Sequence, residues 1–441
     1  MSSTAAAPTS KFQFRRKATA PVAAAAPKVA QAVFKDVTST GRLVLKFTLA
    51  PTDVAYANTL RRAILTEVET VGFRADILED GSTSDVKITK NSTPMSNEML
   101  AHRIGLLPIY VSNPSEWNPS KYSFKMNVVN DSPDPRDVTA SDIQVLVNRG
   151  PEEDPLPIPS NEVFHLDPIS KDTPLLAVLK GRTSNQEPES IMFEAKATLG
   201  IGRENARFIP VSQCSYRYTP DEDPGRRKEF FEAWLMNHKK MSSADLESNP
   251  TRKGELEREF STMEINRCYL VNERNEPMSF DFIVESIGVL DPVYIVARAL
   301  QVIQEKLQGY VSMDAGDPPE NVQIRPADAQ MKGFDFIFSG EDHTLGNLLQ
   351  TYMDANMVDS GEITYVGYKV PHPLKDEMLV RVGVEDGKEL TARTAMVGAM
   401  RGLLSMFSDW SKEWAAVGGS AAAVPTMRTA LKTRRRGPTG F

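Results

Sequence analysis

The sequence predicts an α+β fold that contains two copies of one strand–helix unit and an inserted β-rich domain. The first unit spans residues 47–68, where an alternating apolar strand ends at Pro51 and an amphipathic helix follows. The second unit begins at residue 336. Four residue types recur at one constant spacing: Phe47, Asp53, Asn58 and Leu60 match Phe336, Asp342, Asn347 and Leu349. Each half of the chain also ends in a long amphipathic helix, so we expect two related modules that pack on each other.

The helix of the first unit has two distinct faces. Thr52 or Asp53 can cap its first turn. Apolar residues three and four positions apart form one stripe: Ala57, Leu60, Ile64 and Val68. The polar residues on the opposite face and at the edge of the stripe are Asn58, Arg61, Arg62 and Thr66. One face of this helix is therefore available for a core and the other for a different contact.

The composition changes over residues 76–263, where Pro, Asn, Asp and Ser become frequent. Short alternating runs at 85–88, 123–128 and 143–147 indicate strands separated by turns. A short helix is expected after Ser96, with one apolar face: Met99, Leu100, Ile104 and Leu107. Residues 220–262 are charged and helix-prone, which is typical of solvated helices. We therefore expect an inserted β-rich domain over 76–263.

Two segments of this region invite a catalytic or binding interpretation. His102 and Arg103 lie side by side, but the sequence has no second His or Cys at ligand spacing, so a structural role is favoured. Gly200, Gly202 and Arg203 suggest a phosphate loop, yet the Walker spacing and the full dinucleotide fingerprint are absent. Glu341-Asp342-His343 is the densest carboxylate–His cluster, and the start of a helix explains it better.

The C-terminal part returns to regular alternation. A strand at 278–287 precedes a helix that begins at Asp291-Pro292 and carries one apolar stripe: Val296, Ala299, Ile303, Leu307 and Tyr310. A linker follows over 313–332. The longest helix, 389–416, has a wide stripe: Met396, Ala399, Leu403, Phe407, Trp410 and Trp414. Such a stripe predicts burial against another long helix.

Charge and cysteine content exclude several classes of protein. The net charge is −7, but it is unevenly distributed. The two tails, 1–33 and 417–441, together hold ten basic residues and no acidic residue. The remaining 41 basic and 58 acidic residues give the middle of the chain a net charge near −17. An acidic body argues against a large nucleic-acid-binding surface. Two distant cysteines argue against a zinc ribbon or a disulfide framework. We expect no metal, no cofactor and no membrane span. Both tails are expected to be disordered, with a transit peptide as the alternative for the first.

Several segments resemble one family. DVAYANTLRRAIL at 53–65 and EDHTLGNLLQTYM at 341–353 look like the two signature helices of the α-like subunits of multisubunit RNA polymerases. The first is similar to the larger partner of the pair and the second to the smaller. Three further segments resemble the family: AHRIGLLP at 101–108, FDFIVESIG at 280–288 and VGYKVPHPL at 366–374. The segment at 200–211 is similar to another family segment but has Asn205 and Phe208 where the family often has His and Trp. The presence of both partners in one polypeptide resembles the fused subunit of some large DNA viruses.

The resemblance implies a fold of two α-like dimerisation modules, each a mixed sheet plus long helices, fused in one chain. The expected organisation is a disordered basic tail 1–33, a larger-partner module 34–75 and 264–312, an insert 76–263, a linker 313–332, a smaller-partner module 333–416 and a basic tail 417–441. The implied intramolecular dimerisation residues are Leu60, Ile64, Leu345, Leu348, Leu349, Ile303, Leu307, Phe407, Trp410 and Trp414. The implied subunit-interface residues are Asn58, Arg61, Arg62, Thr66, Asp342, His343 and Asn347.

The resemblance also implies a function. The chain would be a non-catalytic assembly platform that holds the two large catalytic polymerase subunits and docks small accessory subunits during transcription. Little direct nucleic-acid contact, no membrane contact and no homodimer are expected. The location would be intracellular, and for a virus the host cytoplasm or nucleus, with packaging in the virion as an option. A stand-alone interaction scaffold with an α-like core is the alternative, and an enzyme that uses the inserted domain is a third hypothesis.

Overall fold

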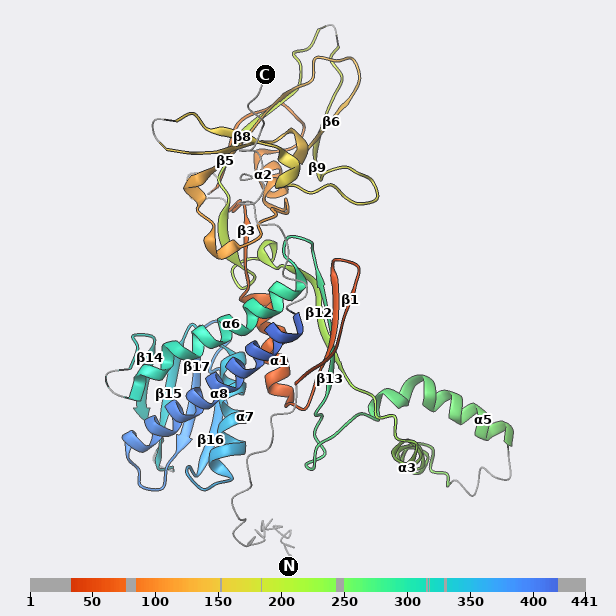
Figure 1. The fold of residues 1–441 in the computed structure, drawn as a ribbon, viewed down its shortest axis with the longest axis vertical. Helices are drawn as coiled ribbons and strands as arrows, with labels where there is room; N and C mark the ends of the chain where they lie inside the picture. Colours follow the sequence, from red (N-terminus) through yellow and green to blue (C-terminus); the bar gives the residue numbers. More distant parts are fainter. Residues whose placement is uncertain are drawn as a thin grey trace, which may run out of the picture. The chain divides into compact units, whose positions relative to one another are not determined.

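The structure is a computed structural model that describes residues 33–76, 85–150, 153–183, 185–242, 250–314, 316, 318–328 and 331–418. The predicted tails lie outside the described residues, apart from their innermost positions, Val33, Val417 and Gly418. The α+β class predicted from the sequence is confirmed (Figure 1). Among the described residues, no helix is both long enough and apolar enough to cross a bilayer.

The first module is a four-stranded antiparallel sheet covered by helices. Its elements are β1 (Phe34–Thr40), β2 (Val44–Leu49), α1 (Val54–Thr66), β12 (Val211–Tyr218), β13 (Phe280–Ser286) and α6 (Pro292–Tyr310). The strand order is β1-β2-β13-β12. Asp53 caps α1 by accepting a hydrogen bond from the Ala55 N–H, and Asp291 caps α6 in the same way through Val293.

The second module repeats this architecture. Its elements are β14 (Val322–Pro326), β15 (Gly333–Ser339), α7 (His343–Met353), β16 (Tyr365–Lys369), β17 (Glu377–Gly383) and α8 (Glu389–Gly418). The strand order is β14-β15-β17-β16, again antiparallel. Both modules therefore run strand, strand, helix, strand, strand, helix, with the last strand inserted between the second and the third. β14 lies within the range predicted as the linker, because its short alternating run borders a segment rich in Gly and Pro.

Corresponding residues of the two modules occupy equivalent positions. Asp53 and Asp342 are the N-caps of α1 and α7, 289 residues apart. The long helices correspond at a constant difference of 100, so that Ile303 matches Leu403. At this spacing, every buried residue of α6 corresponds to a buried residue of α8. The two modules thus share one burial pattern as well as one topology.

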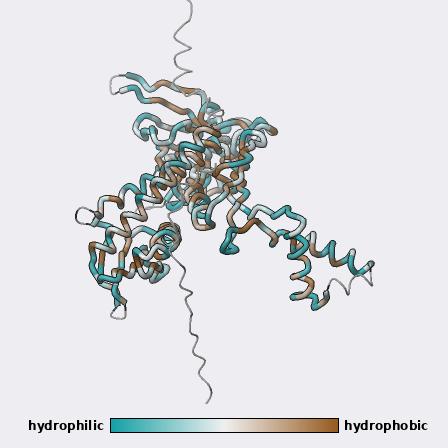
Figure 2. Tube along the Cα trace, turned by 60° about the horizontal axis from the view of Figure 1, so that its bottom comes forward, coloured by the Kyte–Doolittle hydropathy of each residue, from teal (hydrophilic) through white to brown (hydrophobic). Residues whose placement is uncertain are grey.

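One apolar core joins the two modules. α6 lies against α8 and α1 against α7, and within each module the two helices also touch (Figure 1). All ten residues assigned to intramolecular dimerisation belong to this core, and each is at most 6% exposed. Along the helices in Figure 2, hydrophobic and hydrophilic positions alternate, as expected for elements with one buried face.

The strand β1 of the first module also contacts the last helix of the second. The ring of Phe34 lies 4.9 Å from that of Trp414 and 5.9 Å from that of Trp410, centre to centre. The Phe34 N–H donates to a Glu413 carboxylate oxygen over 2.7 Å. The indole N–H of Trp414 donates to the Val293 carbonyl at the start of α6 over 3.1 Å. Polar and aromatic contacts therefore supplement the apolar core between the modules.

The first module carries two insertions that the second lacks. We call residues 67–210, between α1 and β12, the large insertion. Its strands and helix are β3 (Glu69–Gly72), β4 (Val86–Asn91), α2 (Asn97–Gly105), β5 (Tyr122–Val129), β6 (Arg136–Thr139), β7 (Gln144–Val147), β8 (Leu156–Ile158), β9 (Leu175–Leu179), β10 (Ser190–Ala195) and β11 (Thr198–Ile201). They form a five-stranded sheet of order β4-β10-β5-β7-β8 and two strand pairs, β3 with β11 and β6 with β9. These elements enclose a separate apolar core.

The second insertion, residues 219–279 between β12 and β13, is helical. It contains α3 (Pro224–Trp234) and α5 (Pro250–Glu259), which share a small cluster of buried side chains around Trp234 and Phe260. β12 lies within the range predicted for a single insert, but it pairs with β13 and completes the first sheet. The sequence pattern of β12 is that of any half-buried strand, so its partner could not be read from it. We therefore propose that the first module is interrupted twice, at 67–210 and at 219–279.

One detail of the predicted helix after Ser96 is wrong. Ser96 does cap α2, and Leu100, Ile104 and Leu107 are buried. Met99, however, is 62% exposed. The buried face of this short helix is centred on Leu100, Ala101 and Ile104, and Met99 points away from it.

Candidate functional site

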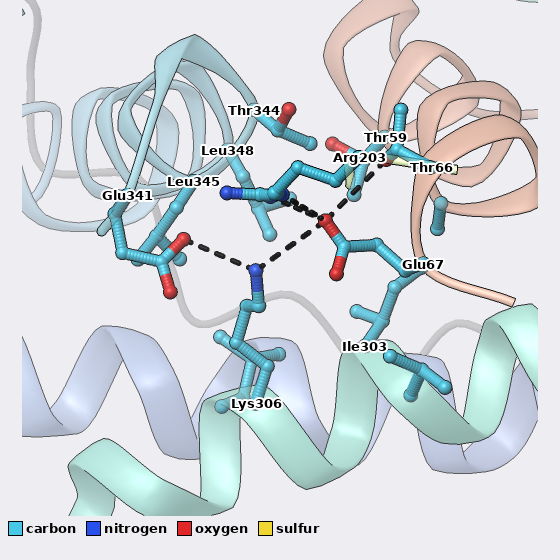
Figure 3. Close-up of a pocket in the computed structure, with 13 residues that line it drawn as sticks. Thr59, Thr66, Glu67, Arg203, Ile303, Lys306, Glu341, Thr344, Leu345 and Leu348 are labelled. Atoms are coloured by element: carbon cyan, nitrogen blue, oxygen red, sulfur yellow. Dashed lines mark hydrogen bonds and ion pairs between the residues drawn. The ribbon is translucent and has the colours of Figure 1, made fainter. Parts of the chain in front are cut away.

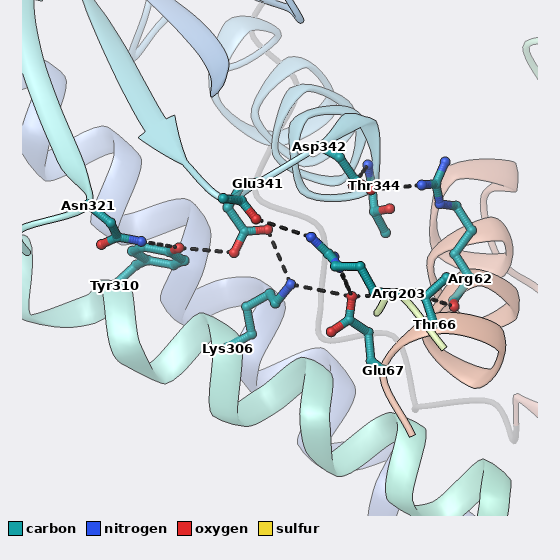
Figure 4. A network of polar contacts seen from close by, with 11 residues as sticks. Arg62, Thr66, Glu67, Arg203, Lys306, Tyr310, Asn321, Glu341, Asp342 and Thr344 are labelled. Atoms are coloured by element: carbon teal, nitrogen blue, oxygen red, sulfur yellow. Dashed lines mark hydrogen bonds and ion pairs between the residues drawn. The ribbon is translucent and has the colours of Figure 1, made fainter. Parts of the chain in front are cut away.

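Arg62 and Asp342, both expected at a subunit interface, pair with each other across the two modules. Arg62 Nη2 donates to Asp342 Oδ2 over 2.8 Å, and each side chain is 32% exposed (Figure 4). Thr66, one turn along α1, donates its hydroxyl to the Arg62 carbonyl over 2.9 Å. The polar end of α1 is thereby joined to the start of α7.

Asp342 has two roles at this position. As the N-cap of α7 it accepts a hydrogen bond from the Thr344 N–H over 2.7 Å, and its second oxygen receives Arg62. Burial opposes its ionisation, but the hydrogen bonds from Thr344 and the charges of Arg62 and Arg203 outweigh this effect. The pKa of Asp342 is therefore lowered, and its carboxylate is charged at neutral pH.

The large insertion returns to the end of α1 and delivers Arg203 to the same place. Gly202 approaches α1 so closely that a Cβ on it would lie 2.2 Å from the Leu65 carbonyl oxygen. This approach lets the Arg203 N–H donate to the Thr66 carbonyl at the end of α1 over 3.0 Å, where helical carbonyls lack a partner within the helix. The glycine spacing that suggested a phosphate loop is therefore explained by the close packing of backbones.

The Arg203 guanidinium then crosses to the second module. Its Nε donates to Glu67 over 3.0 Å, and its Nη1 donates to the Gly340 carbonyl over 3.1 Å. Burial opposes the charged form of Arg203, but Glu67 and the second module's two acids outweigh it and raise the pKa. Gly340 has a positive φ of 79°, which favours glycine in the turn that leads from β15 to Glu341.

Glu341 is a buried carboxylate whose partners come from α6. Its side chain is 7% exposed and lies 3.2 Å from Lys306 Nζ. The Tyr310 hydroxyl donates to its other oxygen over 3.0 Å, and Asn321 donates to that hydroxyl over 2.9 Å. Burial and the charge of Glu341 raise the pKa of Tyr310, so the hydroxyl keeps its proton for this bond. Lys306 also lies 3.8 Å from Glu67, which closes the network in Figure 4.

These residues surround a small cavity between α1, α6 and α7 (Figure 3). Its floor is apolar and includes Ile303, Leu345 and Leu348, whereas Glu67, Lys306 and other charged groups lie at its rim. The space open to a water-sized molecule is about 30 Å³. This volume suits two or three waters at most, since a single water needs about 10–15 Å³. The cavity is therefore too small for a nucleotide or a comparable substrate.

The other residues expected at the subunit interface lie apart from this network. Arg61 donates from Nε and Nη2 to the Asn58 side-chain oxygen, over 3.0 and 2.8 Å, along the surface of α1. His343 is exposed, with its ring 5.8 Å from that of Tyr368. Asn347 is half-buried on α7. The structure thus brings together Arg62, Thr66 and Asp342, while the remaining four lie along the two helices.

The sequence does not single out Glu67 or Lys306, and it places Tyr310 only in an apolar stripe and Arg203 only in a weak phosphate-loop pattern. Lys306 and Tyr310 lie one turn apart on α6, but Glu67, Arg203 and Glu341 come from three other segments. Two signals are present in the sequence: the unusual Gly-x-Gly-Arg segment and a carboxylate pair before a helix. A single sequence does not reveal that these segments meet.

Catalytic groups do not gather at the junction. Among the described residues, no three His, Cys, Asp or Glu side chains form a group that could hold a metal ion. Both cysteines are buried and unpaired, and burial raises the pKa of the Cys214 thiol to about 12. A thiol with such a pKa is not a nucleophile at neutral pH.

Comparison with known proteins agrees with the two-module architecture. Two models of the RNA polymerase Rpb3/Rpb11 dimerisation domain match, one at residues 46–307 and the other at 334–413. The chain belongs to the Rpb3/Rpb11 dimerisation domain family. The first match covers most of the first module and both insertions, and the second match covers most of the second module.

Curated relatives of this Rpb3/Rpb11 family chain come from eukaryotes and archaea. The chain is 28% identical over 271 residues to DNA-directed RNA polymerase II subunit RPB3 of Schizosaccharomyces pombe, covering 59% of this chain and 80% of the relative. It is 23% identical over 290 residues to DNA-directed RNA polymerase subunit Rpo3 of Methanobrevibacter smithii, covering 61% and 94%. It is 25% identical over 306 residues to subunit RPAC1 of human RNA polymerases I and III, covering 60% and 80%.

Proposed function

We propose that this chain is the non-catalytic assembly platform of a multisubunit DNA-directed RNA polymerase. The observation that carries the proposal is the fusion of two modules of one family and one topology around a single apolar core. Relatives named as polymerase subunits match 59–61% of the chain, and we propose that the second module supplies the smaller partner within the same chain. Pairing is therefore satisfied internally, and no homodimer is expected.

The partners we propose are the two large catalytic subunits and small accessory subunits. The polar residues of α1 and α7 are the proposed contact surface for a large subunit. Arg62 suits this role because its ion pair with Asp342 uses one of its five N–H donors, and no further hydrogen bond of its guanidinium is found among the described residues. A guanidinium held in place with free donors can bind carboxylates or backbone carbonyls of a partner.

The proposal includes an intracellular location and little direct contact with nucleic acid. The acidic middle of the chain, near −17, supports the second point, since phosphate binding requires clustered Lys and Arg. A large DNA virus as the source rests only on the fusion of both partners in one polypeptide.

Affinity purification from cells that make the whole polymerase tests the proposal. A tagged full chain should recover the two largest polymerase subunits in comparable amounts, together with small subunits. A stand-alone scaffold would recover other proteins and neither large subunit, which would reject the proposal. Size-exclusion chromatography with light scattering on the chain alone should give the mass of a monomer.

A further inference from the structure

The polar network between the modules is asymmetric in charge, because its positive groups lie on one side and most of its negative groups on the other. Arg62, Lys306 and Glu67 belong to the first module and its insertion, as does Arg203, whereas Glu341 and Asp342 belong to the second. The first-module side therefore carries three positive charges and one negative, a net of +2, and the second-module side carries −2. The two sides neutralise each other only when a first module meets a second module.

Two modules of one topology could otherwise pair with their own kind. α1 packs on α7 and α6 packs on α8, so each contact joins corresponding elements, as in a two-fold symmetric dimer. In such an arrangement, like pairs (first with first, second with second) would retain apolar contacts between equally buried helices. Apolar burial alone is non-directional and does not distinguish the three pairings.

The counterparts of the charged residues show what a like pair would lose. At the spacing of 289, Glu341 corresponds to Thr52, and at the spacing of 100, Lys306 corresponds to Met406. In a pair of second modules, Glu341 would meet Met406 in place of Lys306, and a carboxylate that is 7% exposed would lose its cation. In a pair of first modules, Lys306 would meet Thr52 and keep only Glu67 of its own side, 3.8 Å away, while two sides of net charge +2 would face each other. A buried carboxylate without its cation and the facing of like charges are both unfavourable, so both like pairs are disfavoured.

Arg62 contributes little to this discrimination. Its partner Asp342 corresponds to Asp53, which is the N-cap of α1, so Asp53 of another first module could receive Arg62 in a like pair. In a pair of second modules, Asp342 would meet Thr351, but the Asp342 side chain is 32% exposed, so this loss costs little. The selective contact is therefore the more deeply buried one, between Lys306 and Glu341.

We propose that Lys306 and Glu341, supported by Arg203 and Tyr310, select pairing between a first and a second module and exclude pairing of like modules. The selection acts by leaving Glu341 without its cation in one wrong combination and by bringing like charges face to face in the other. It directs each chain to close on itself, since a pairing of like modules must join two chains.

Exchange of Lys306 and Glu341 for their counterparts tests the proposal in the full chain. The double variant Lys306→Met, Glu341→Thr removes the charges and gives both sides of the junction the same residues. Heavy-isotope and light chains are refolded together from urea over a range of concentrations, sized by light scattering and cross-linked. The parent should return to monomer. The double variant should form about tenfold more dimer at equal concentration, with cross-links that join first modules of a heavy and a light chain.

Arg62→Thr is the matched control, because it introduces the residue found at the corresponding position, Thr351, and removes another ion pair between the modules. It should refold to monomer like the parent. Monomeric refolding of the double variant, or dimers whose cross-links join only first to second modules, would overturn the proposal.

A second measurement tests the proposal if the double variant refolds poorly. Urea unfolding midpoints of the two single variants and of the double variant form a thermodynamic cycle. Lys306→Met alone leaves Glu341 buried without its cation, so its midpoint should be lower than that of the double variant. Strictly additive midpoints would show that the two residues are independent, and the proposal would fail.

Discussion

Trp410→Ala should destabilise the fused core of both modules. Trp410 is 4% exposed, and its ring packs 5.2 Å from that of Phe407 on its own helix and 5.9 Å from that of Phe34 on β1. Truncation therefore opens a cavity between α8 of the second module and β1 of the first. We therefore expect the truncation to weaken the packing of the two modules on each other.

The size of the effect follows from burial and cavity formation. A tryptophan buries roughly 150–250 Å², worth about 4–6 kcal/mol at about 25 cal/mol per Å². The alanine that remains keeps part of this area, and neighbouring side chains relax into part of the cavity. We therefore expect a loss of about 3 kcal/mol in the free energy of unfolding, at the lower end of the range for Trp→Ala in a core. For a core of this size, the melting temperature should fall by about 6–12 °C.

Urea unfolding and hydrogen exchange together provide the assay. Lys412→Ala is the control on the same helix, because the Lys412 side chain is 72% exposed and its replacement should change stability by no more than about 0.5 kcal/mol. The large insertion has its own core, so amides of β5 and β10 should keep their protection in the Trp410 variant. A loss below about 1 kcal/mol, or equal loss of protection in the insertion, would refute the assignment of Trp410 to a core shared by the two modules.

Three further predictions concern the polar residues and the C-terminal tail. Arg62→Ala should weaken co-purification with the second-largest polymerase subunit, while the free energy of unfolding falls by at most about 1 kcal/mol because the ion pair is partly exposed. The control Arg217→Ala, which changes another paired arginine of the first module, should leave co-purification unchanged. Equal retention of the subunit by both variants would remove Arg62 from the interface. Asp342→Asn should lose less stability than the parent as the pH falls from 5 to 3. The pKa of Asp342 is lower in the folded state than its unfolded value of about 3.9, so the carboxylate stabilises the fold above that value and this contribution is lost as the pH falls through the folded pKa. Asn has no such titration and preserves the helix cap. Identical acid profiles of the two proteins would contradict this account. Deletion of residues 425–441 should leave polymerase assembly intact in a reconstitution assay, and failure to assemble would assign the tail a role.

The sequence predicted the parts of the fold that depend on local patterns. Residue type predicts a cap at Thr52 or Asp53, of which Asp53 is the one used, and a helix start at Asp291-Pro292. The buried stripes of the four core helices follow from a period of 3.6 residues. The repeated Phe, Asp, Asn and Leu positions indicated the second module before any contact was known. Local patterns were sufficient here because each element buries one face.

The site was less predictable because its residues become neighbours only after folding. Asp342 was expected to start a helix and Arg62 to face a partner, but nothing in the sequence indicated that they pair. Glu341 was attributed to the same helix start, yet it turns toward Lys306 and Tyr310 on α6. The limits predicted for a single insert, 76–263, differ from those in the structure for a similar reason. Strand β12 pairs with β13, which follows in the sequence only after the helical insertion.

The second module serves as an internal reference for what was added to the first. It connects α7 to β16 and β16 to β17 by short segments, at the same two places where the first module carries its insertions. The large insertion is held to the shared core: Arg298 of α6 donates two hydrogen bonds to Glu69, over 3.0 and 2.7 Å, and Arg203 donates to the Thr66 carbonyl of α1 and to the Gly340 carbonyl of the second module. Because Arg203 belongs to the insertion and also donates to the second module, one residue takes part both in the placement of the insertion and in the pairing of the modules.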